Sequence, residues 1–262
     1  MNQPEVGVVL DGLGLPAKDA LQAAARLSFT HVELPAQSGD VDPAHLSRTG
    51  RRHLLHYVSS LGLRLSALGG DLGGARFNDG SALERRLDKT RQILELAAEL
   101  RVPVVTTHLG RVDEDTLNKG YVAQAIRELA DVSDRTGTLV ALETGSADPA
   151  VLAGLIRSVN CPTLGSAYDP ASLLIDGFDP LAGVEPLADR ILMARVRDAV
   201  AGSGPRPGRE MPLGQGQIDL AEYLAALDQA GYRGTSFVRR TDSDRPLEDL
   251  AQARERLVRL LR

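Results

Sequence analysis

Short runs of β-branched and other apolar residues alternate along the chain with longer stretches whose apolar residues recur at helical spacing. The runs predict strands at residues 6–10, 31–34, 64–68, 102–107, 139–143, 163–169, 191–197 and 235–239. The stretches between them predict helices at 17–27, 43–61, 81–100, 117–135, 148–158, 180–188, 219–230 and 247–261. Eight strand–helix units without a break in composition predict one domain over residues 1–262, a (β/α)8 TIM barrel. An open, doubly wound sheet is the alternative, because spacing alone does not prove closure.

Local signals mark several helix starts and one irregular segment. The run Ser-Ala-Leu-Glu at 81–84 has the pattern of a capping box, and Asp148 and Asp219 stand where N-caps are expected. Residues 201–217, after the seventh strand, are rich in Gly and Pro and predict a flexible loop. Its arginines suggest either a phosphate site or a solvated lid. Just before it, Asp198 is expected to form a salt bridge with the adjacent Arg197.

Composition excludes several classes of protein. The net charge is −5 and the pI near 5.6, Trp is absent and other aromatics are few, which argues against a nucleic-acid partner. No apolar run approaches the roughly 18 residues of a membrane span, and the N-terminus lacks the pattern of a secretory signal. The single cysteine, Cys161, excludes an intrachain disulfide and fits a reducing compartment. We therefore expect a cytoplasmic protein without a membrane partner.

Polar residues gather at or just beyond the C-terminal ends of the predicted strands. In a TIM barrel these ends converge on one mouth, where active sites are built, so we expect a functional site there. Lysine occurs only at positions 18, 89 and 119, away from strand ends, which argues against a Schiff-base enzyme. The strand-end residues are Asp11, Glu33, His108, Glu143, Asp169, Arg195, Arg197, Asp198 and Arg239.

The order of several short motifs resembles the xylose isomerase-like TIM barrels, a superfamily of sugar and sugar-phosphate isomerases and epimerases and of metal-dependent apurinic endonucleases. The motifs are Val-Pro-Val-Val-Thr-Thr-His-Leu-Gly at 102–110, the fifth strand ending in Glu143, Tyr-Asp at 168–169, Arg-Ile-Leu-Met-Ala-Arg-Val-Arg-Asp at 190–198 and Gly-Gln-Gly-Gln-Ile-Asp at 214–219. The resemblance implies a barrel with a ligand site at its mouth.

The same resemblance implies a divalent cation held by a glutamate, an aspartate, a histidine and a second glutamate from strands five to eight. Glu143 and Asp169 match the first two ligands, but Arg195 and Arg239 stand at the positions of the last two. Two guanidiniums would balance the two carboxylates and repel a cation. We therefore expect no cofactor, and a metal such as Mn or Mg only if the arginines point away.

The resemblance implies a sugar (phosphate) isomerase/epimerase-like protein that binds a small polyhydroxylated or anionic carbohydrate-type ligand. A non-catalytic binding or assembly barrel is the alternative. An apurinic endonuclease is disfavoured because no histidine follows His108. Substrate, stereochemistry and oligomeric state are not defined by the sequence. The expected catalytic residues are Glu143 and His108, and the expected substrate-binding residues are Glu33, Asp169, Arg195 and Arg239.

Overall fold

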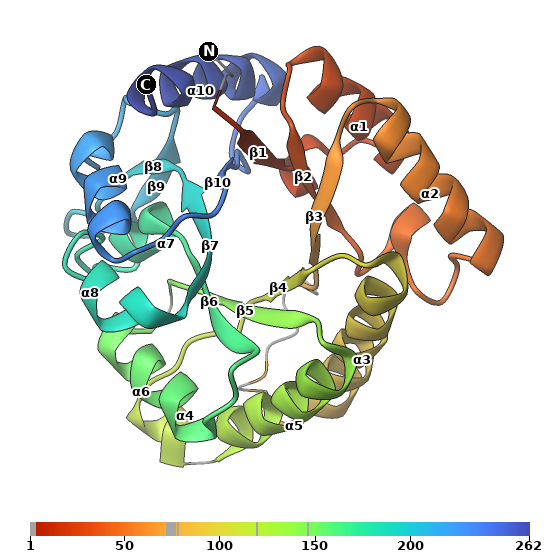
Figure 1. The fold of residues 1–262 in the computed structure, drawn as a ribbon. Coiled ribbons are helices and arrows are strands. Elements are labelled where there is room, and N and C mark those ends of the chain that lie inside the picture. Colours follow the sequence, from red (N-terminus) through yellow and green to blue (C-terminus); the bar gives the residue numbers. More distant parts are fainter. Residues whose placement is uncertain (1–3, 72–76, 78, 119, 146) are drawn as a thin grey trace.

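Eight parallel strands close into a barrel, in which the last strand along the chain lies between the first and the seventh (Figure 1). The computed structural model describes residues 4–71, 77, 79–118, 120–145 and 147–262. The TIM barrel prediction is confirmed, and the open-sheet alternative is wrong. The barrel strands are β1 (Val6–Val9), β2 (His31–Pro35), β3 (Arg64–Gly69), β4 (Val104–Thr107), β5 (Leu139–Glu143), β6 (Leu164–Tyr168), β7 (Ile191–Val196) and β10 (Ser236–Val238).

Helices surround the barrel (Figure 1). They are α1 (Ala17–Arg26), α2 (Arg48–Ser60), α3 (Leu83–Leu100), α4 (Glu114–Asn118), α5 (Tyr121–Thr136), α6 (Pro149–Val159), α7 (Pro170–Ile175), α8 (Val184–Leu187), α9 (Leu220–Gln229) and α10 (Pro246–Leu260). Short 3-10 helices are η1 (Asp11–Leu13), η2 (Gly39–Val41) and η3 (Ala188–Arg190). The short α4 and α7 follow β4 and β6 and were not predicted. The predicted helix 180–188 is divided between α8 and η3.

Two of the three predicted caps are confirmed. Asp148 and Asp219 each accept hydrogen bonds from two N–H groups in the first turn of α6 and α9. The capping box at 81–84 is wrong, because α3 begins at Leu83 and has no side-chain cap. The N–H and hydroxyl of Ser81 instead donate to Asp79 Oδ1, at 3.0 and 2.7 Å. The Ser81 hydroxyl is therefore engaged with Asp79 and does not cap α3.

The Gly- and Pro-rich segment forms an antiparallel hairpin of β8 (Asp198–Val200) and β9 (Arg209–Met211). Its base is organised by Asp198, which accepts the N–H groups of Ala199, Gly214, Gly216 and Ile218 at 2.8–3.2 Å. A Cβ at Gly216 would lie 2.1 Å from Asp198 Oδ1, so only glycine fits there. The predicted salt bridge between Asp198 and Arg197 is therefore wrong, since backbone N–H groups surround this carboxylate.

The barrel interior is layered. An apolar cluster separate from the core between strands and helices fills its middle, formed by Val9, Ala67, Val104, Ala141, Ala167, Met193 and Phe237. Side chains along a strand alternate between its two faces, so the residue two positions further on also points inward. For most of these strands that residue is polar: Asp11, Thr106, Glu143, Asp169, Arg195 and Arg239. A polar layer thus lies above the apolar one, at the C-terminal mouth.

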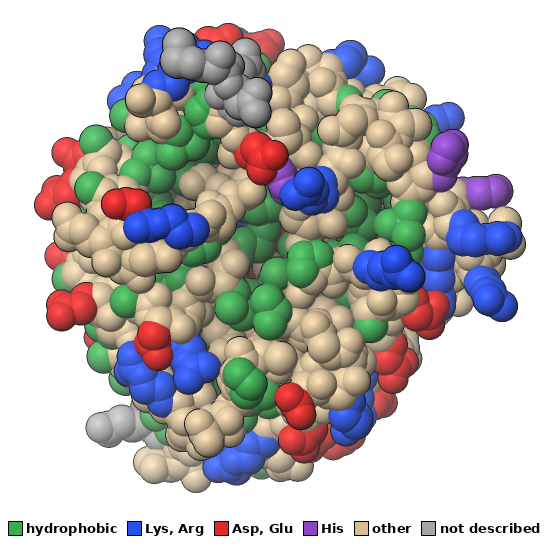
Figure 2. Space-filling model, viewed as in Figure 1, with side chains coloured by type: hydrophobic (Ala, Val, Ile, Leu, Met, Phe, Trp, Pro, Cys, Tyr) green, Lys and Arg blue, Asp and Glu red, His purple; other side chains and the backbone are tan. Residues whose placement is uncertain are grey.

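Within the described part of the chain, no helix is long and apolar enough to cross a membrane. On the face shown in Figure 2, acidic and basic side chains lie mostly around the rim, and the middle holds hydrophobic side chains beside a few charged ones.

Candidate functional site

Arg195 lies at the floor of the mouth and is fully buried. Its Nη1 is 2.6 Å from Glu33 Oε2, and its Nη2 is 3.5 Å from Glu143 Oε1. The other oxygen of Glu33 accepts a hydrogen bond from the Thr106 hydroxyl at 2.8 Å. Glu33 is itself only 2% exposed, so its carboxylate is enclosed by Arg195 and Thr106. This geometry makes Glu33 a support for Arg195.

Arg239 enters the mouth from the residue after β10. Its Nε lies 3.0 and 3.2 Å from the two carboxylate oxygens of Asp11, and its Nη2 also donates to Asp11. The remaining nitrogen, Nη1, donates to Glu143 Oε2 at 3.3 Å. Asp11 was noted among the strand-end residues but not as a site residue. It pairs with two of the three guanidinium nitrogens of Arg239, which leaves Nη1 directed towards Glu143.

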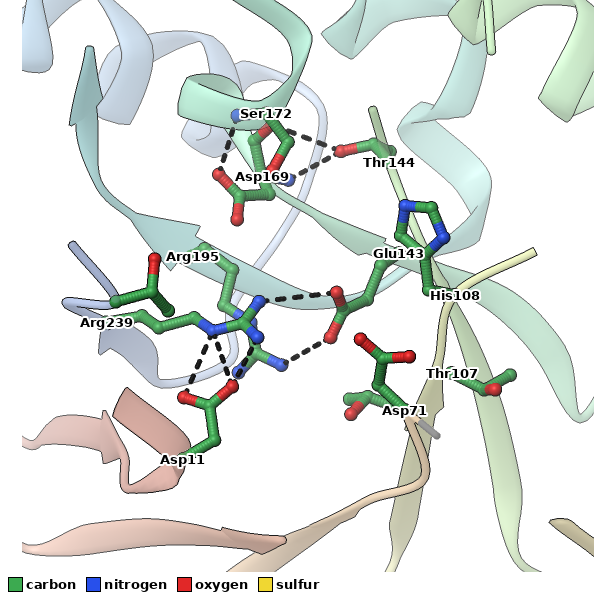
Figure 3. Close-up of polar contacts among 12 residues, drawn as sticks. Asp11, Asp71, Thr107, His108, Glu143, Thr144, Asp169, Ser172, Arg195 and Arg239 are labelled. Carbon is green, nitrogen blue, oxygen red and sulfur yellow. Dashed lines mark hydrogen bonds and ion pairs between the residues drawn. The ribbon is translucent and has the colours of Figure 1, made fainter. Parts of the chain in front are cut away.

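Glu143 is shared between the two arginines, and Figure 3 shows both guanidiniums directed at its carboxylate. Its contacts of 3.3 and 3.5 Å are longer than the 2.6 Å between Arg195 and Glu33. Burial would raise the pKa of Glu143, but Arg239, Arg195 and His108 outweigh it and hold that pKa below its usual value. Glu143 is therefore an ionised carboxylate with two long ionic contacts.

Asp169 forms its ion pair with Arg197, and not with Arg195 or Arg239 as expected. Its Oδ2 lies 2.6 Å from Arg197 Nη1, while its Oδ1 caps α7 by accepting the N–H groups of Ala171 and Ser172. Burial would raise the pKa of Asp169, but Arg197 and Arg239 lower it below the usual value. The expectation that Arg195 and Arg239 neutralise both carboxylates directly thus holds for Glu143 and is wrong for Asp169. The cap turns the Asp169 side chain towards Arg197.

Glu210, on β9, completes the network and was missed by the sequence analysis. Its Oε1 accepts from Arg197 Nε at 2.9 Å. Its Oε2 accepts the N–H and hydroxyl of Thr241 and the N–H of Asp242, all at 2.9 Å, and lies 3.0 Å from Arg240. The hairpin is thereby tied to the mouth and to the loop after β10. Glu210 lies in a segment of loop-like composition, where no sequence signal distinguished it.

His108 follows β4 and is half-buried beside Glu143 (Figure 3). Its Nδ1 accepts a hydrogen bond from the N–H of Gly110 at 2.9 Å. The structure thus brings the expected residues Glu143, His108, Arg195, Arg239 and Asp169 to one mouth, with Glu33 beneath Arg195.

The family follows from a comparison with known proteins. The family described as "Xylose isomerase-like TIM barrel" matches residues 21–260. The chain belongs to this family. No curated protein sequence matches it significantly.

Several solved structures show the same fold. A xylose isomerase domain protein from Planctomyces limnophilus is 23% identical, with a TM-score of 0.87 over 99% of this chain and 98% of that one. A D-tagatose 3-epimerase-like protein is 18% identical, with a TM-score of 0.81 over 98% and 97%. A xylose isomerase-like TIM barrel protein from Mycobacterium smegmatis, in complex with magnesium, is 18% identical, with a TM-score of 0.80 over 99% and 97%.

Among the described residues of this family member, no three His, Cys, Asp or Glu side chains are grouped so that they could hold a metal ion. Glu143 and Asp169 both contact guanidinium groups.

The buried carboxylates predict a steep loss of stability in acid. The pKa values of Asp169 and Glu210 are lowered in the folded protein mainly by Arg197, against the effect of burial. Their stabilisation is therefore complete above the unfolded pKa of about 4 and is lost as pH falls through the lower folded values. Chemical unfolding measured between about pH 7 and pH 2 should show this loss.

Arg197→Met provides the control for this prediction. Without Arg197, burial would dominate and raise the pKa of both carboxylates. Protonation of these carboxylates in acid should then recover part of the stability that the variant loses at neutral pH. The stability difference between wild type and variant should shrink as pH falls. A difference that stays constant with pH would contradict the assigned coupling.

Proposed function

We propose that the mouth binds a small polyhydroxylated or anionic carbohydrate-type ligand without a divalent cation. The observation that carries this proposal is the position of two guanidiniums against Glu143, at places where the family resemblance assigns a histidine and a glutamate ligand. A cation beside Glu143 would meet Arg195 and Arg239, and Asp169 is already paired with Arg197. Such a donor set does not suit a tight divalent site.

The distribution of exposure supports a ligand with several hydroxyl groups. Arg195 and Asp169 are buried, whereas Glu143, Asp11, Arg239 and His108 remain partly exposed. The exposed part of the mouth therefore offers both donors and acceptors, which is the pattern that polar small molecules need. Its place at the C-terminal ends of the strands is where TIM barrels carry their sites.

Proton transfer at carbon is the chemistry that fits this arrangement. Glu143 would take a proton from the carbon next to a carbonyl, the electron pair of the C–H bond would form a carbon–carbon double bond, and the π pair of the carbonyl would move onto its oxygen. As Glu143 becomes neutral, Arg239, the partly exposed member of the pair, would turn to the resulting enediolate oxygen, while Arg195 stays beneath Glu143 on Glu33. The long contacts of 3.3 and 3.5 Å to Glu143 favour this exchange, and stabilisation would be greatest where charge develops. Return of a proton to the opposite face of the same carbon would complete an epimerisation. Its delivery to the former carbonyl carbon, with a proton moved from one oxygen to the other, would complete an isomerisation.

A non-catalytic binding barrel is the second candidate, and one observation favours it. Arg239 and Arg195 help hold the pKa of Glu143 below its usual value although burial raises it, and a carboxylate with a low pKa is a weak base. Binding without turnover is the expected behaviour in that case.

Solvent deuterium distinguishes the two candidates. We expect a panel of ketoses, sugar acids and sugar phosphates in D2O with EDTA to contain at least one compound that gains carbon-bound deuterium. Glu143→Gln should reduce the exchange by about 100-fold or more, as removal of a general base does. Glu248→Gln, which alters an exposed carboxylate on α10, should leave it unchanged. Mass spectrometry or NMR of the recovered sugar measures the exchange.

Other outcomes are equally informative. Exchange that survives in Glu143→Gln contradicts the assigned base. Thermal stabilisation by a panel member without exchange supports the non-catalytic barrel. Stoichiometric metal in protein purified without chelator, lost on Glu143→Gln, overturns the proposal.

A further inference from the structure

Arg86 is a fully buried arginine of α3 that reaches the end of β4 from outside the barrel. Its Nη2 donates to the Thr107 hydroxyl at 3.0 Å and to the carbonyl oxygen of His108 at 2.9 Å. Its Nη1 lies 3.5 Å from Asp71 Oδ1, and its guanidinium carbon is 4.7 Å from the centre of the Phe77 ring. These contacts join α3 to the residues that follow β3 and β4.

The burial of Arg86 is energetically unfavourable in itself. Burial lowers the pKa of Arg86, with Asp71 opposing that effect, because a guanidinium is better solvated by water than by the core. Its neighbours on the buried face of α3 include the apolar Leu83, Leu87 and Leu94. A leucine in place of Arg86 would fill the same interface without a desolvation penalty. Besides its contacts with Asp71 and the Phe77 ring, the arginine supplies two hydrogen bonds at the end of β4 that a leucine could not make.

One of those hydrogen bonds holds the backbone carbonyl of His108, the residue whose ring lies in the mouth. The Gly110 N–H donates to His108 Nδ1 at 2.9 Å, so Nδ1 must present its lone pair. The proton of a neutral His108 ring is then on Nε2. Gly110 has a φ of +82°, which favours glycine, and it stands two residues after the carbonyl that Arg86 holds. The tautomer therefore depends on the path of the chain from 108 to 110.

We propose that Arg86 is a positioning residue for His108. By fixing the His108 carbonyl, it keeps the Gly110 N–H on Nδ1 and so maintains the Nε2–H tautomer. This assigns His108 the role of hydrogen-bond donor or acid, and leaves Glu143 as the base. The catalytic meaning of that assignment rests on the proposed function, whereas the tautomer itself does not.

The test is nitrogen-15 NMR of the imidazole rings in the intact protein. The chain has five histidines, so comparison with His108→Gln assigns the His108 signals. Wild type should show an unprotonated Nδ1 and a protonated Nε2. In Arg86→Met both nitrogens should move towards the averaged signals of a free imidazole, and the Gly110 amide should exchange roughly tenfold faster. Arg86→Lys, which retains one donor group, should restore part of both effects.

Thr107→Val is the matched control, because it removes the other acceptor of Arg86 Nη2 and leaves the His108 carbonyl in place. It should keep the wild-type tautomer. A proton on Nδ1 in wild type, or an unchanged tautomer in folded Arg86→Met, would overturn the proposal. Should Arg86→Met not fold, wild type and Arg86→Lys still decide it. No ligand is needed, so this result stands apart from a negative deuterium experiment.

Discussion

Replacing Arg195 with methionine should destabilise the protein by about 3–5 kcal/mol at neutral pH, as measured by urea unfolding. Arg195 is fully buried and contacts both Glu33 and Glu143. Methionine fills much of the same volume but leaves these carboxylates without their shared cation. The loss therefore reflects uncompensated charge rather than a cavity. Stability should recover in part in the double variant Arg195→Met with Glu33→Gln, which removes one of the stranded charges.

Arg233→Met is the matched control for this experiment. Arg233 pairs with Asp228 at 2.8 Å, close to the 2.6 Å between Arg195 and Glu33, but both side chains of this pair are largely exposed. Solvent screens such a pair, so the variant should change stability by no more than about 0.5 kcal/mol. Similar losses in both variants would show that burial does not decide the strength of the Arg195 contacts.

The fold was predictable because barrel strands are buried on both faces and read as short apolar runs. The observed β5 has the predicted bounds, and the other barrel strands lie within the predicted runs or differ at their ends. The two-residue period along a strand also accounts for the polar layer at the mouth. That step required only the order of residues, which is why Glu143, Asp169, Arg195 and Arg239 were placed together.

The pairing of those residues was not predictable in the same way. Asp169 contacts Arg197 because its other oxygen caps α7, a short helix absent from the predicted pattern. Glu210 comes from a three-residue strand in a Gly- and Pro-rich segment, where no apolar alternation could reveal it. Arg86 looks like an ordinary charged residue of an amphipathic helix. In each case the partner is fixed by side-chain direction in three dimensions, which spacing along the chain does not encode.

Changing Arg195 to His together with Arg239 to Glu should give the protein a metal requirement. The exchange removes two positive charges, adds one negative charge, and supplies the two ligand types that the family resemblance assigns to these positions. Histidine nitrogen and carboxylate oxygen beside Glu143 and Asp169 suit Mn2+ or Zn2+. Asp169 would have to exchange its contact with Arg197 for the metal, and Arg197 would keep Glu210 as its partner. We expect about one equivalent of metal by elemental analysis and about 2.7 kcal/mol of stabilisation at a hundredfold excess over Kd.

The double variant Arg195→Met with Arg239→Met separates ligand supply from charge removal. It lacks the same two guanidiniums and leaves the same carboxylates unpaired, but it offers no new ligand. If the guanidiniums occupy the former ligand positions, metal should stabilise the His/Glu variant strongly and the Met/Met variant weakly. Equal stabilisation of both would mean that Glu143 and Asp169 suffice and that the arginines only block access. A folded His/Glu variant that takes up no metal would mean that side chains at 195 and 239 do not converge with Glu143 and Asp169 on one ion.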